Sequence, residues 1–261
     1  MPNRTGWSRE QLLVAFHLYC RMPFGKMHNR NPEIVRYAEL IGRTPSALAM
    51  KLTNIASLDP AITGTGRKGL EGASAADRAM WVEMQADWDR FAIQSQQAFS
   101  QITAIGDPEL AADDEDIADA AADYEGTNKT ITSTARIGQA FFRRAVLSAY
   151  QFRCCITGMA IPQLLVASHI VPWQADAANR LNPRNGLCLS MLHDKAFDIG
   201  IICIADDFTV RVSRKHEKAD DPFFRSALLA YDGKQINLPE KFRPNPDFLT
   251  YHRDHIFEGQ G

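Results

Sequence analysis

The feature that most constrains this chain is the stretch from Cys155 to Asp198. His169 ends an apolar run within it, Asn185 follows sixteen residues later, and His193 comes eight residues after Asn185. A short apolar run bounded by turn residues predicts a buried strand, and the segment MLHDKAFD before Gly200 predicts a helix that the glycine ends. We therefore expect a strand, a loop, a second strand and a short helix, arranged around one divalent metal ion.

Composition places the chain among ordinary globular proteins. It has 261 residues, of which 45% are apolar and 23% charged, and this length favours two domains. No apolar run approaches the roughly 20 residues of a membrane span, and the first residues lack the apolar core of a secretory signal. Five cysteines without paired spacing indicate free thiols. We expect a cytoplasmic protein with no membrane partner.

Charge is distributed unevenly along the sequence. Residues 1–70 carry ten Lys or Arg against four acids, residues 105–125 carry nine acids and no base, and residues 126–261 carry seventeen bases and thirteen acids. Two basic blocks therefore flank an acidic tract, although the formal net charge is −2. A protein whose total charge is negative can still present basic surfaces to phosphate.

The acidic tract marks the predicted domain boundary. We expect an α+β protein with a helical domain over residues 1–104, an acidic linker over 105–127 and a second domain over 128–261. The tract has no apolar stripe that a helix would bury, which favours a linker. An alternative is that its charge imitates that of DNA and shields a basic surface.

The first domain has the signals of several helices. Ser8, Asn31 and Thr44 stand where helix N-caps are expected, and a long helix is predicted from Ala73 to Ile102. Between the second and third helices the pattern is typical of a helix-turn-helix, a DNA-reading motif. It has a small residue, a turn glycine and an apolar anchor at relative positions 5, 9 and 15: Ala38, Gly42 and Leu48. An ordinary three-helix bundle is the alternative.

Candidate nucleic-acid-binding residues lie in three places. On the outward face expected for the third helix, Lys51 is suited to a phosphate and Asn54 to a base edge. The glycine-rich segment TGTGRKG could press Arg67 and Lys68 onto a phosphate backbone. A predicted amphipathic helix over residues 138–152 would direct another basic pair towards solvent or phosphate: Arg143 and Arg144.

The residue types around the two histidines suit phosphodiester hydrolysis, which needs a base for the attacking water and a cation for the developing charge. His169, at a strand end, is placed to be the base. His193, at the start of the helix, is placed to bind a metal through a neutral ring nitrogen. Asn185 can tie the loop to the strand through its amide.

These motifs, SHIVPW followed by NGLCLSMLHDKAFD, resemble the HNH endonuclease family, and in particular the branch found in bacterial restriction-type proteins. The resemblance extends from about Arg136 to the C-terminus. It implies a ββα-metal fold, Mg²⁺, Mn²⁺ or another divalent ion, and cleavage of double-stranded DNA. It also implies catalytic roles for His169 as general base, Asn185 as the middle asparagine and His193 as the final histidine.

Two departures from the family pattern concern metals. Many relatives have an acid before the first histidine, where this chain has Ser168, so we expect Asp198 to join His193 as a metal ligand, with Asp194 as its substitute. A structural role for Asp198 is an equal alternative. Many relatives also carry two CxxC pairs that bind zinc, and this chain has none, so no structural zinc is expected.

The sequence thus predicts a metal-dependent DNA endonuclease of restriction or defence type, and dependence on base modification in its substrate is included in this hypothesis. Because one such site nicks one strand, a double-strand break implies a homodimer. The rival hypothesis is a DNA-binding regulator with a degenerate, non-catalytic HNH fold, which the serine at position 168 favours.

Overall fold

The computed structural model describes residues 6–64, 72–106, 133–216 and 221–259. The predicted acidic linker lies almost entirely outside the described residues. Helices dominate the N-terminal half and short strands appear only in the C-terminal half, which agrees with the expected mixture of a helical region and a small sheet. Among the described residues, no helix combines the length and the apolar composition needed to cross a membrane.

The N-terminal half consists of helices whose starts are set by capping residues. The predicted caps Ser8, Asn31 and Thr44 each accept a hydrogen bond from a backbone N–H in the first turn of their helix. The elements are α1 (Arg9–Arg21), η1 (Phe24–Lys26), α2 (Pro32–Leu40), α3 (Pro45–Ala56), α4 (Pro60–Thr63), α5 (Ala75–Ala86) and α6 (Trp88–Gly106).

A tight turn joins α2 to α3. Gly42 adopts a positive φ of +67°, a conformation that other residues rarely accept. Ala38 and Leu48, on either side of it, are fully buried. The two helices therefore pack against each other through the positions that the sequence pattern indicates.

The long helix predicted from Ala73 to Ile102 is wrong in one respect, because the structure divides it into α5 and α6. Asp87 lies between them with φ −153°, outside the helical region. Its carboxylate accepts a hydrogen bond from the N–H of Arg90 at 2.9 Å, so Asp87 starts a new helix. The apolar spacing continues across the break, which explains why the pattern alone suggested one helix.

The C-terminal half is built around a β-hairpin. β1 (Leu165–His169) pairs antiparallel with β2 (Gly186–Ser190), with Leu165 opposite Ser190 and His169 opposite Gly186. α8 (Ser133–Ala149) precedes the hairpin and α9 (Met191–Asp198) follows it directly. The remaining elements are η2 (Pro162–Leu164), η3 (Ala177–Asn179), η4 (Pro183–Asn185), β3 (Ile202–Ile204), β4 (Val210–Val212), η5 (Arg214–His216), α10 (Pro222–Ala227), η6 (Leu229–Tyr231) and α11 (Pro246–His255).

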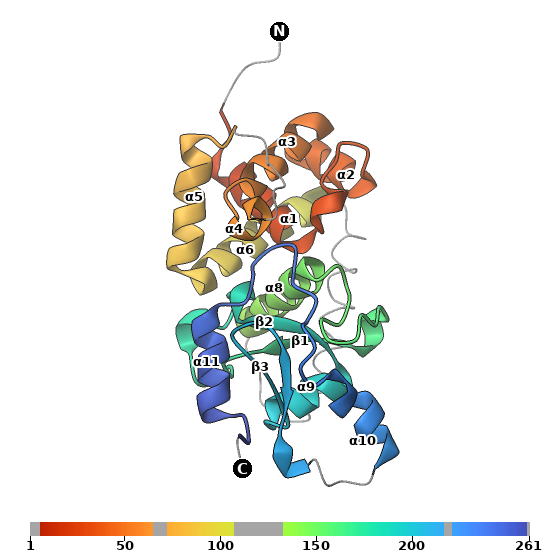
Figure 1. Ribbon diagram of the computed structural model, residues 1–261. Coiled ribbons are helices and arrows are strands. Elements are labelled where there is room, and N and C mark those ends of the chain that lie inside the picture. Colours follow the sequence, from red (N-terminus) through yellow and green to blue (C-terminus); the bar gives the residue numbers. More distant parts are fainter. Residues whose placement is uncertain (1–5, 65–71, 107–132, 217–220, 260–261) are drawn as a thin grey trace.

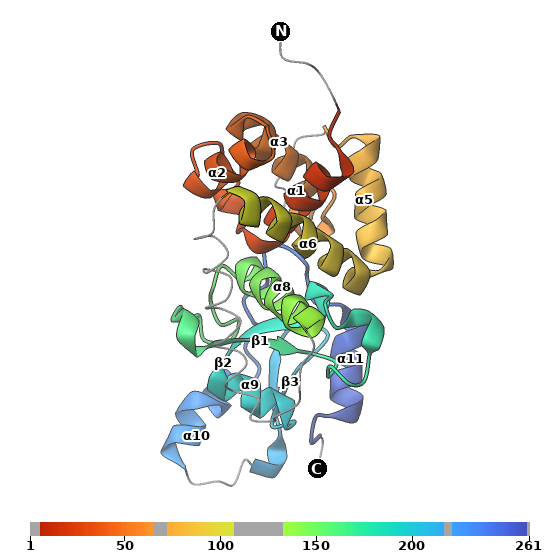
Figure 2. The same ribbon diagram turned by 180° about the vertical axis from the view of Figure 1, so that it is seen from behind.

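The β1–β2 hairpin lies between two helices. α8 contacts both strands from one side and α9 contacts both from the other, as Figures 1 and 2 show from opposite directions. Gly200 ends α9 with φ +75°, as the sequence indicates, and a Cβ there would lie 2.1 Å from the carbonyl oxygen of Ile256. No larger residue fits at this corner, so the direction of the chain after α9 is fixed.

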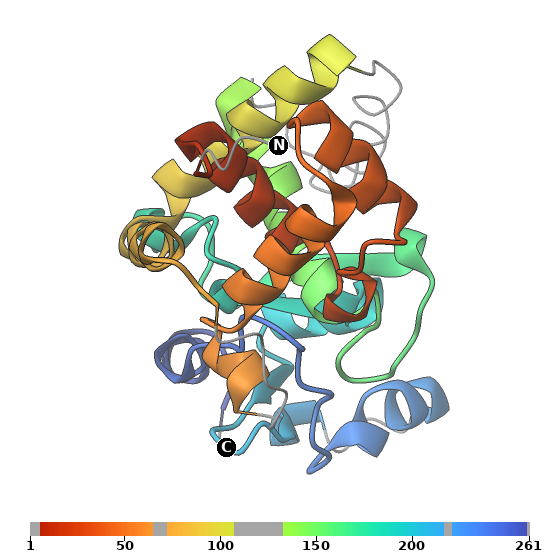
Figure 3. The same ribbon diagram turned by 90° about the horizontal axis from the view of Figure 1, so that it is seen from above.

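The two halves are packed together. α8 contacts α1 and α6, and the view from above shows the N-terminal helices lying across it (Figure 3). A segment of the C-terminal extension returns to the same place: Lys241 is fully buried and its Nζ donates to the carbonyls of Tyr19, Cys20 and Met22 at the end of α1. The described parts of the two halves thus share one hydrophobic core.

Candidate functional site

His169, at the end of β1, is held on the α8 side of the hairpin. Its ring stacks on the ring of Phe142 from α8, with centroids 4.0 Å apart and planes 8° from parallel, and meets the edge of Trp173 at 5.6 Å. Its Nε2 lies 2.9 Å from the carbonyl oxygen of Arg180. A carbonyl can only accept, so Nε2 carries the proton and Nδ1 keeps its lone pair.

The surroundings of His169 keep its imidazole neutral. Burial lowers its pKa to about 4, and the hydrogen bond with the Arg180 backbone opposes this change only in part. At neutral pH the ring is therefore an uncharged acceptor at Nδ1.

Asn185 fixes the loop that closes over His169. Its Oδ1 accepts from the N–H of Val171 at 2.8 Å, and its Nδ2 donates to the carbonyls of Val171 and Asn179. The side chain is 1% exposed. Because Asn185 binds Asn179 and His169 binds the next residue, Arg180, the two side chains hold consecutive carbonyls of one loop. The amide tie expected from the sequence is present in these hydrogen bonds.

His193 lies in the first turn of α9 and is 4% exposed. Its Nδ1 is 2.7 Å from the hydroxyl of Ser190, the residue that also caps the helix, and its ring meets the edge of Tyr231 at 5.5 Å. Its Nε2 is buried and makes no hydrogen bond. Burial lowers the pKa of His193, and the nearby backbone of Ala227 acts in the opposite direction.

The rings of His169 and His193 have separate contacts. His169 packs on α8 and His193 belongs to α9, on the opposite side of the hairpin, and the contacts of the two rings have no residue in common. These contacts do not join the two rings, so the expected arrangement, with both imidazoles facing one ion, stays a prediction.

Asp198 also lies apart from His193. α9 is a regular helix through both residues, and five helical positions correspond to a rotation of about 140°. Asp198 is exposed, whereas His193 and Asp194 are buried. The distorted first turn that would bring His193 and Asp198 together is absent from this helix.

The donor atoms around His193 decide what kind of metal would fit. Among the described residues, no group of three or more His, Cys, Asp or Glu side chains could hold an ion. An imidazole nitrogen without a partner is a ligand that transition-metal ions accept, whereas Mg²⁺ prefers oxygen, so the other ligands of an ion held here would be oxygens of water and phosphate. His193 fits such an ion only with its proton on Nδ1, donated to Ser190, because Nε2 must be free.

Ser168 stands where many HNH enzymes have an acid. It is 3% exposed and its hydroxyl makes no hydrogen bond. Because adjacent strand residues face opposite sides of a sheet, Ser168 faces α9 while His169 faces α8. Two buried polar atoms without partners, Ser168 Oγ and His193 Nε2, thus belong to the same side of the hairpin.

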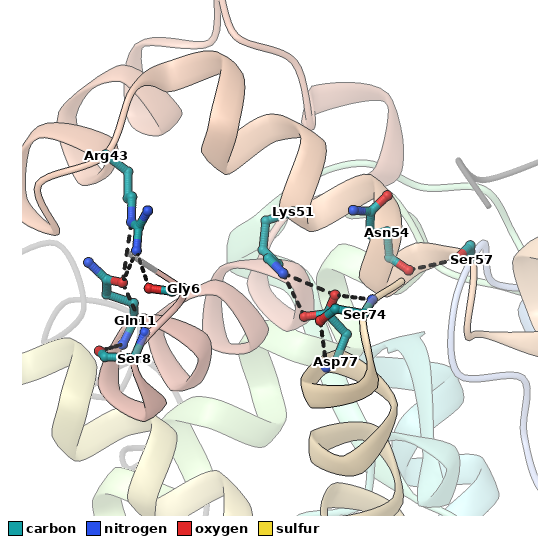
Figure 4. Close-up of polar contacts among 9 residues, drawn as sticks. All are labelled: Gly6, Ser8, Gln11, Arg43, Lys51, Asn54, Ser57, Ser74 and Asp77. Atoms are coloured by element: carbon teal, nitrogen blue, oxygen red, sulfur yellow. Dashed lines mark hydrogen bonds and ion pairs between the residues drawn. The ribbon is translucent and has the colours of Figure 1, made fainter. Parts of the chain in front are cut away.

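The expected outward position of Lys51 and Asn54 is wrong, because both side chains are buried. The Nζ of Lys51 lies 2.7 Å and 3.0 Å from the carboxylate oxygens of Asp77, whose side chain is fully buried (Figure 4). Asp77 belongs to α5, which packs on this face of α3. The side of α3 that carries Lys51, which the sequence pattern assigned to DNA, therefore faces α5.

The other predicted nucleic-acid ligands have separate locations. Arg67 and Lys68 lie outside the described residues. Arg143 donates from Nη1 to the carbonyl of Leu165 at 2.9 Å, which joins α8 to the start of β1. Arg144 lines a small pocket against α1 and α6. Arg143 and Arg144 are both only partly exposed.

Several residues of the site were not predicted from the sequence. Phe142 supports the ring of His169, and Trp173 and Arg180 close the loop over it, with Arg180 Nε donating to the carbonyl of Trp173 at 2.7 Å. Of these residues, Ser190 was the easiest to predict from the sequence, because a serine just before the start of a helix is a typical N-cap. The others act across sequence separations that no local pattern reports.

Residues 154–205 match the family model described as HNH endonuclease. No curated protein matches the chain. The matched segment contains β1, β2, α9 and β3, and with them His169, Asn185 and His193. The match supports the HNH family for this segment, and with it a nuclease, a hydrolase of phosphodiester bonds.

Proposed function

We propose that this chain is a metal-dependent DNA endonuclease. The observation that carries the proposal is that the segment matching the HNH family contains a neutral, firmly oriented imidazole, that of His169, at the end of a hairpin strand. A hydrolase needs such a group to take a proton from water.

In the proposed reaction, His169 accepts the proton of the attacking water at Nδ1. The hydrogen bond from Nε2 to the Arg180 carbonyl fixes the tautomer, and the stack on Phe142 fixes the plane of the ring. Asn185 acts through the loop, by holding the neighbouring carbonyl in place. A phosphate beside the ring would raise the pKa of His169 and strengthen it as a base.

The proposed metal requirement follows from the family resemblance and from the unpartnered Nε2 of His193. A divalent ion, Mg²⁺ or Mn²⁺, would stabilise the charge that develops on the phosphate. Within this chain, His193 would hold the ion and Ser190 would orient His193. Asp198 stays a proposed second ligand, which a rearrangement of the start of α9 would have to bring closer.

The wider proposals concern DNA choice and biological role. We propose that α2 and α3 read DNA as a helix-turn-helix, with exposed residues such as Ser46 and Met50 in place of Lys51. Arg67, Lys68, Arg143 and Arg144 remain proposed phosphate ligands. A restriction or defence role, dependence on a modified base, a homodimer for double-strand cleavage and a cytoplasmic location belong to the same proposal and follow from the resemblance and the composition.

A plasmid cleavage assay tests the function. Supercoiled DNA is incubated with the full chain and Mg²⁺, Mn²⁺ or EDTA, in parallel with a His169→Ala variant and with a His255→Ala control, an exposed histidine on α11. We expect cutting that needs the metal, disappears in His169→Ala and persists in the control. DNA binding without cutting in any divalent ion, or equal cutting by His169→Ala, would overturn the proposal.

The same assay separates the finer points. Methylated and unmethylated plasmids compared side by side report a dependence on modification. The ratio of nicked to linear product as a function of enzyme concentration reports whether two protomers act together, because a dimer makes linear product increasingly at higher concentration.

A further inference from the structure

A small pocket lies where the two halves of the protein meet, away from the hairpin. It is formed by α1, α6 and α8, and the residues lining it include His17, Arg21, Gln96, Phe141 and Arg144. Three helices from both halves of the chain therefore contribute to one recess. The family match does not include it, and of its residues only Arg144 appears in the proposed function, as a phosphate ligand.

His17 is one of the polar groups that line this recess. It is 3% exposed, its ring stacks on Phe99 with centroids 4.2 Å apart, and Phe141 packs against it at 5.7 Å. Its Nδ1 is buried and makes no hydrogen bond. Buried polar atoms are almost always satisfied, so a buried nitrogen without a partner calls for an explanation. An atom from a ligand would supply the partner that the protein does not.

Two arginines line the pocket together with His17. Arg21 is almost fully buried, with its guanidinium 4.8 Å from the centre of the Phe99 ring, and its Nε lies 3.4 Å from the carboxylate of Glu33. Arg144 approaches from α8. Burial holds the pKa of His17 well below its usual value, and the charges of Arg21 and Arg144 lower it further.

We infer that this pocket binds a phosphate-type oxyanion. One oxygen would accept a hydrogen bond from Nδ1–H of His17, and the negative charge would pair with the guanidinium groups of Arg21 and Arg144, which match phosphate geometry. Phosphate of this kind has two sources, free inorganic phosphate and the backbone of DNA. The inference does not depend on the proposed nuclease activity, because none of these residues belongs to the hairpin site.

Binding of inorganic phosphate to the full chain is the first measurement. Calorimetric titration and thermal unfolding are carried out with sodium phosphate and, at equal ionic strength, with sodium chloride. We expect saturable binding of phosphate and a rise in Tm that chloride does not produce. Arg144→Gln should weaken the binding about tenfold, the effect of losing one charge-assisted hydrogen bond. Arg90→Gln, which removes the same charge from an exposed site on α6, should leave it unchanged.

A second variant guards against a failure of Arg144→Gln to fold. Gln96→Glu has the same shape and places a carboxylate at the pocket beside the two arginines, so it should abolish phosphate binding while the protein stays folded. In the DNA arm, the affinity for a short duplex is measured in EDTA by fluorescence anisotropy for the wild type and both variants. Loss of duplex affinity without any effect of inorganic phosphate identifies the DNA backbone as the source.

The outcome that overturns the inference is equally clear. If phosphate and chloride have the same effect on Tm, and if neither pocket variant changes duplex affinity, the pocket binds no phosphate. Equal weakening by Arg90→Gln and Arg144→Gln would show general electrostatic attraction without a site.

Discussion

The imidazole of His169 lies flat on the phenyl ring of Phe142, with their centroids 4.0 Å apart. His169 belongs to β1 of the hairpin, and Phe142 belongs to α8, which also packs against α1 and α6 of the N-terminal half. This contact buries one face of the proposed base and contributes to the desolvation that lowers its pKa to about 4. It links the packing of the protein to the chemistry proposed for it.

Replacing Phe142 by leucine should impair cleavage more than it impairs folding. Loss of the flat contact lets the ring tilt and admits water, so we expect cleavage to fall on the order of tenfold to a hundredfold. The pKa of His169 should rise from about 4 towards its usual value near 6.5, which moves the acid limb of the cleavage profile to higher pH. The measurement is the rate of plasmid nicking between pH 4 and 8.

Phe91→Leu is the matched control, because Phe91 is as deeply buried as Phe142 but lies on α6 and packs against Phe16, away from the hairpin. Both substitutions should cost about 1 kcal/mol of stability. An equal loss of activity in the two variants, with no movement of the acid limb in either, would show that Phe142 has no special role.

Asn185 should prove necessary to the loop over His169. Asn185→Ala leaves the N–H and carbonyl of Val171 and the carbonyl of Asn179 without their partner, and we expect a loss of about 2–4 kcal/mol. Asn185→Asp keeps the acceptor but sets a carboxylate against two carbonyls, so it should be no more stable than the alanine variant. Urea unfolding measures both, and an aspartate variant close to wild type would contradict the assigned bonds.

Ser190 should control the response to metal. Ser190→Ala removes the partner of His193 Nδ1, so we expect the metal concentration for half-maximal cleavage to rise about 10- to 100-fold, together with a loss of about 1 kcal/mol from the helix cap. Ser190→Asp can still cap the helix and accept the Nδ1 proton, so it should restore much of the metal response. The measurement is the nicking rate as a function of Mn²⁺ concentration for each variant. An unchanged half-maximal concentration in Ser190→Ala would show that His193 does not bind the metal.

The buried pair of Lys51 and Asp77 should behave as a structural bridge. Lys51→Met alone leaves the fully buried carboxylate of Asp77 without its cation and should cost about 3–5 kcal/mol. The double variant with Asp77→Leu should lose less than the sum of the single variants, and urea unfolding of all four proteins gives the coupling energy. Duplex affinity of the folded Lys51→Met protein should equal that of the wild type, whereas a selective loss of DNA binding would restore the original prediction.

The contrast between Lys51 and Ser8 shows what the sequence can predict. Ser8, Asn31 and Thr44 act on the first turn that follows them, so the local sequence contains both partners of each hydrogen bond. Lys51 meets Asp77 across 26 residues, and a polar residue on a helix looks the same from the sequence whether it faces water or a buried carboxylate.

In the candidate site, too, contacts between residues far apart in the sequence could not be predicted. The motif located His169, Asn185 and His193, and the local reasoning about the Asn185 amide agrees with its hydrogen bonds. Which side of the hairpin each ring faces depends on the packing of α8 and α9, and the sequence spacing contains no information on that. The support of His169 by Phe142, 27 residues earlier in the chain, belongs to the same class of long-range contact.

Buried histidines should make the protein sensitive to mild acid. Burial lowers the pKa of His17, His169, His193 and His252, to about 4 for His169 and His252. In the unfolded chain each titrates near 6.5, so between about pH 6.5 and 4 the unfolded state binds more protons than the folded state. Stability should therefore be fully present above pH 6.5 and fall as the pH is lowered, by up to about 1.4 kcal/mol per pH unit for each histidine.

The control for this pH dependence lies on α11. His252 donates from Nε2 to the carbonyl of Phe197 and stacks on its ring, whereas His255 on the same helix is exposed. His252→Gln keeps a donor but cannot take up a proton, so the slope of unfolding free energy against pH should decrease, while His255→Gln should leave it unchanged. Urea unfolding at pH 7, 6 and 5 measures the slopes. A stability that stays constant from pH 7 to 5 would mean that these imidazoles are not held neutral by the fold.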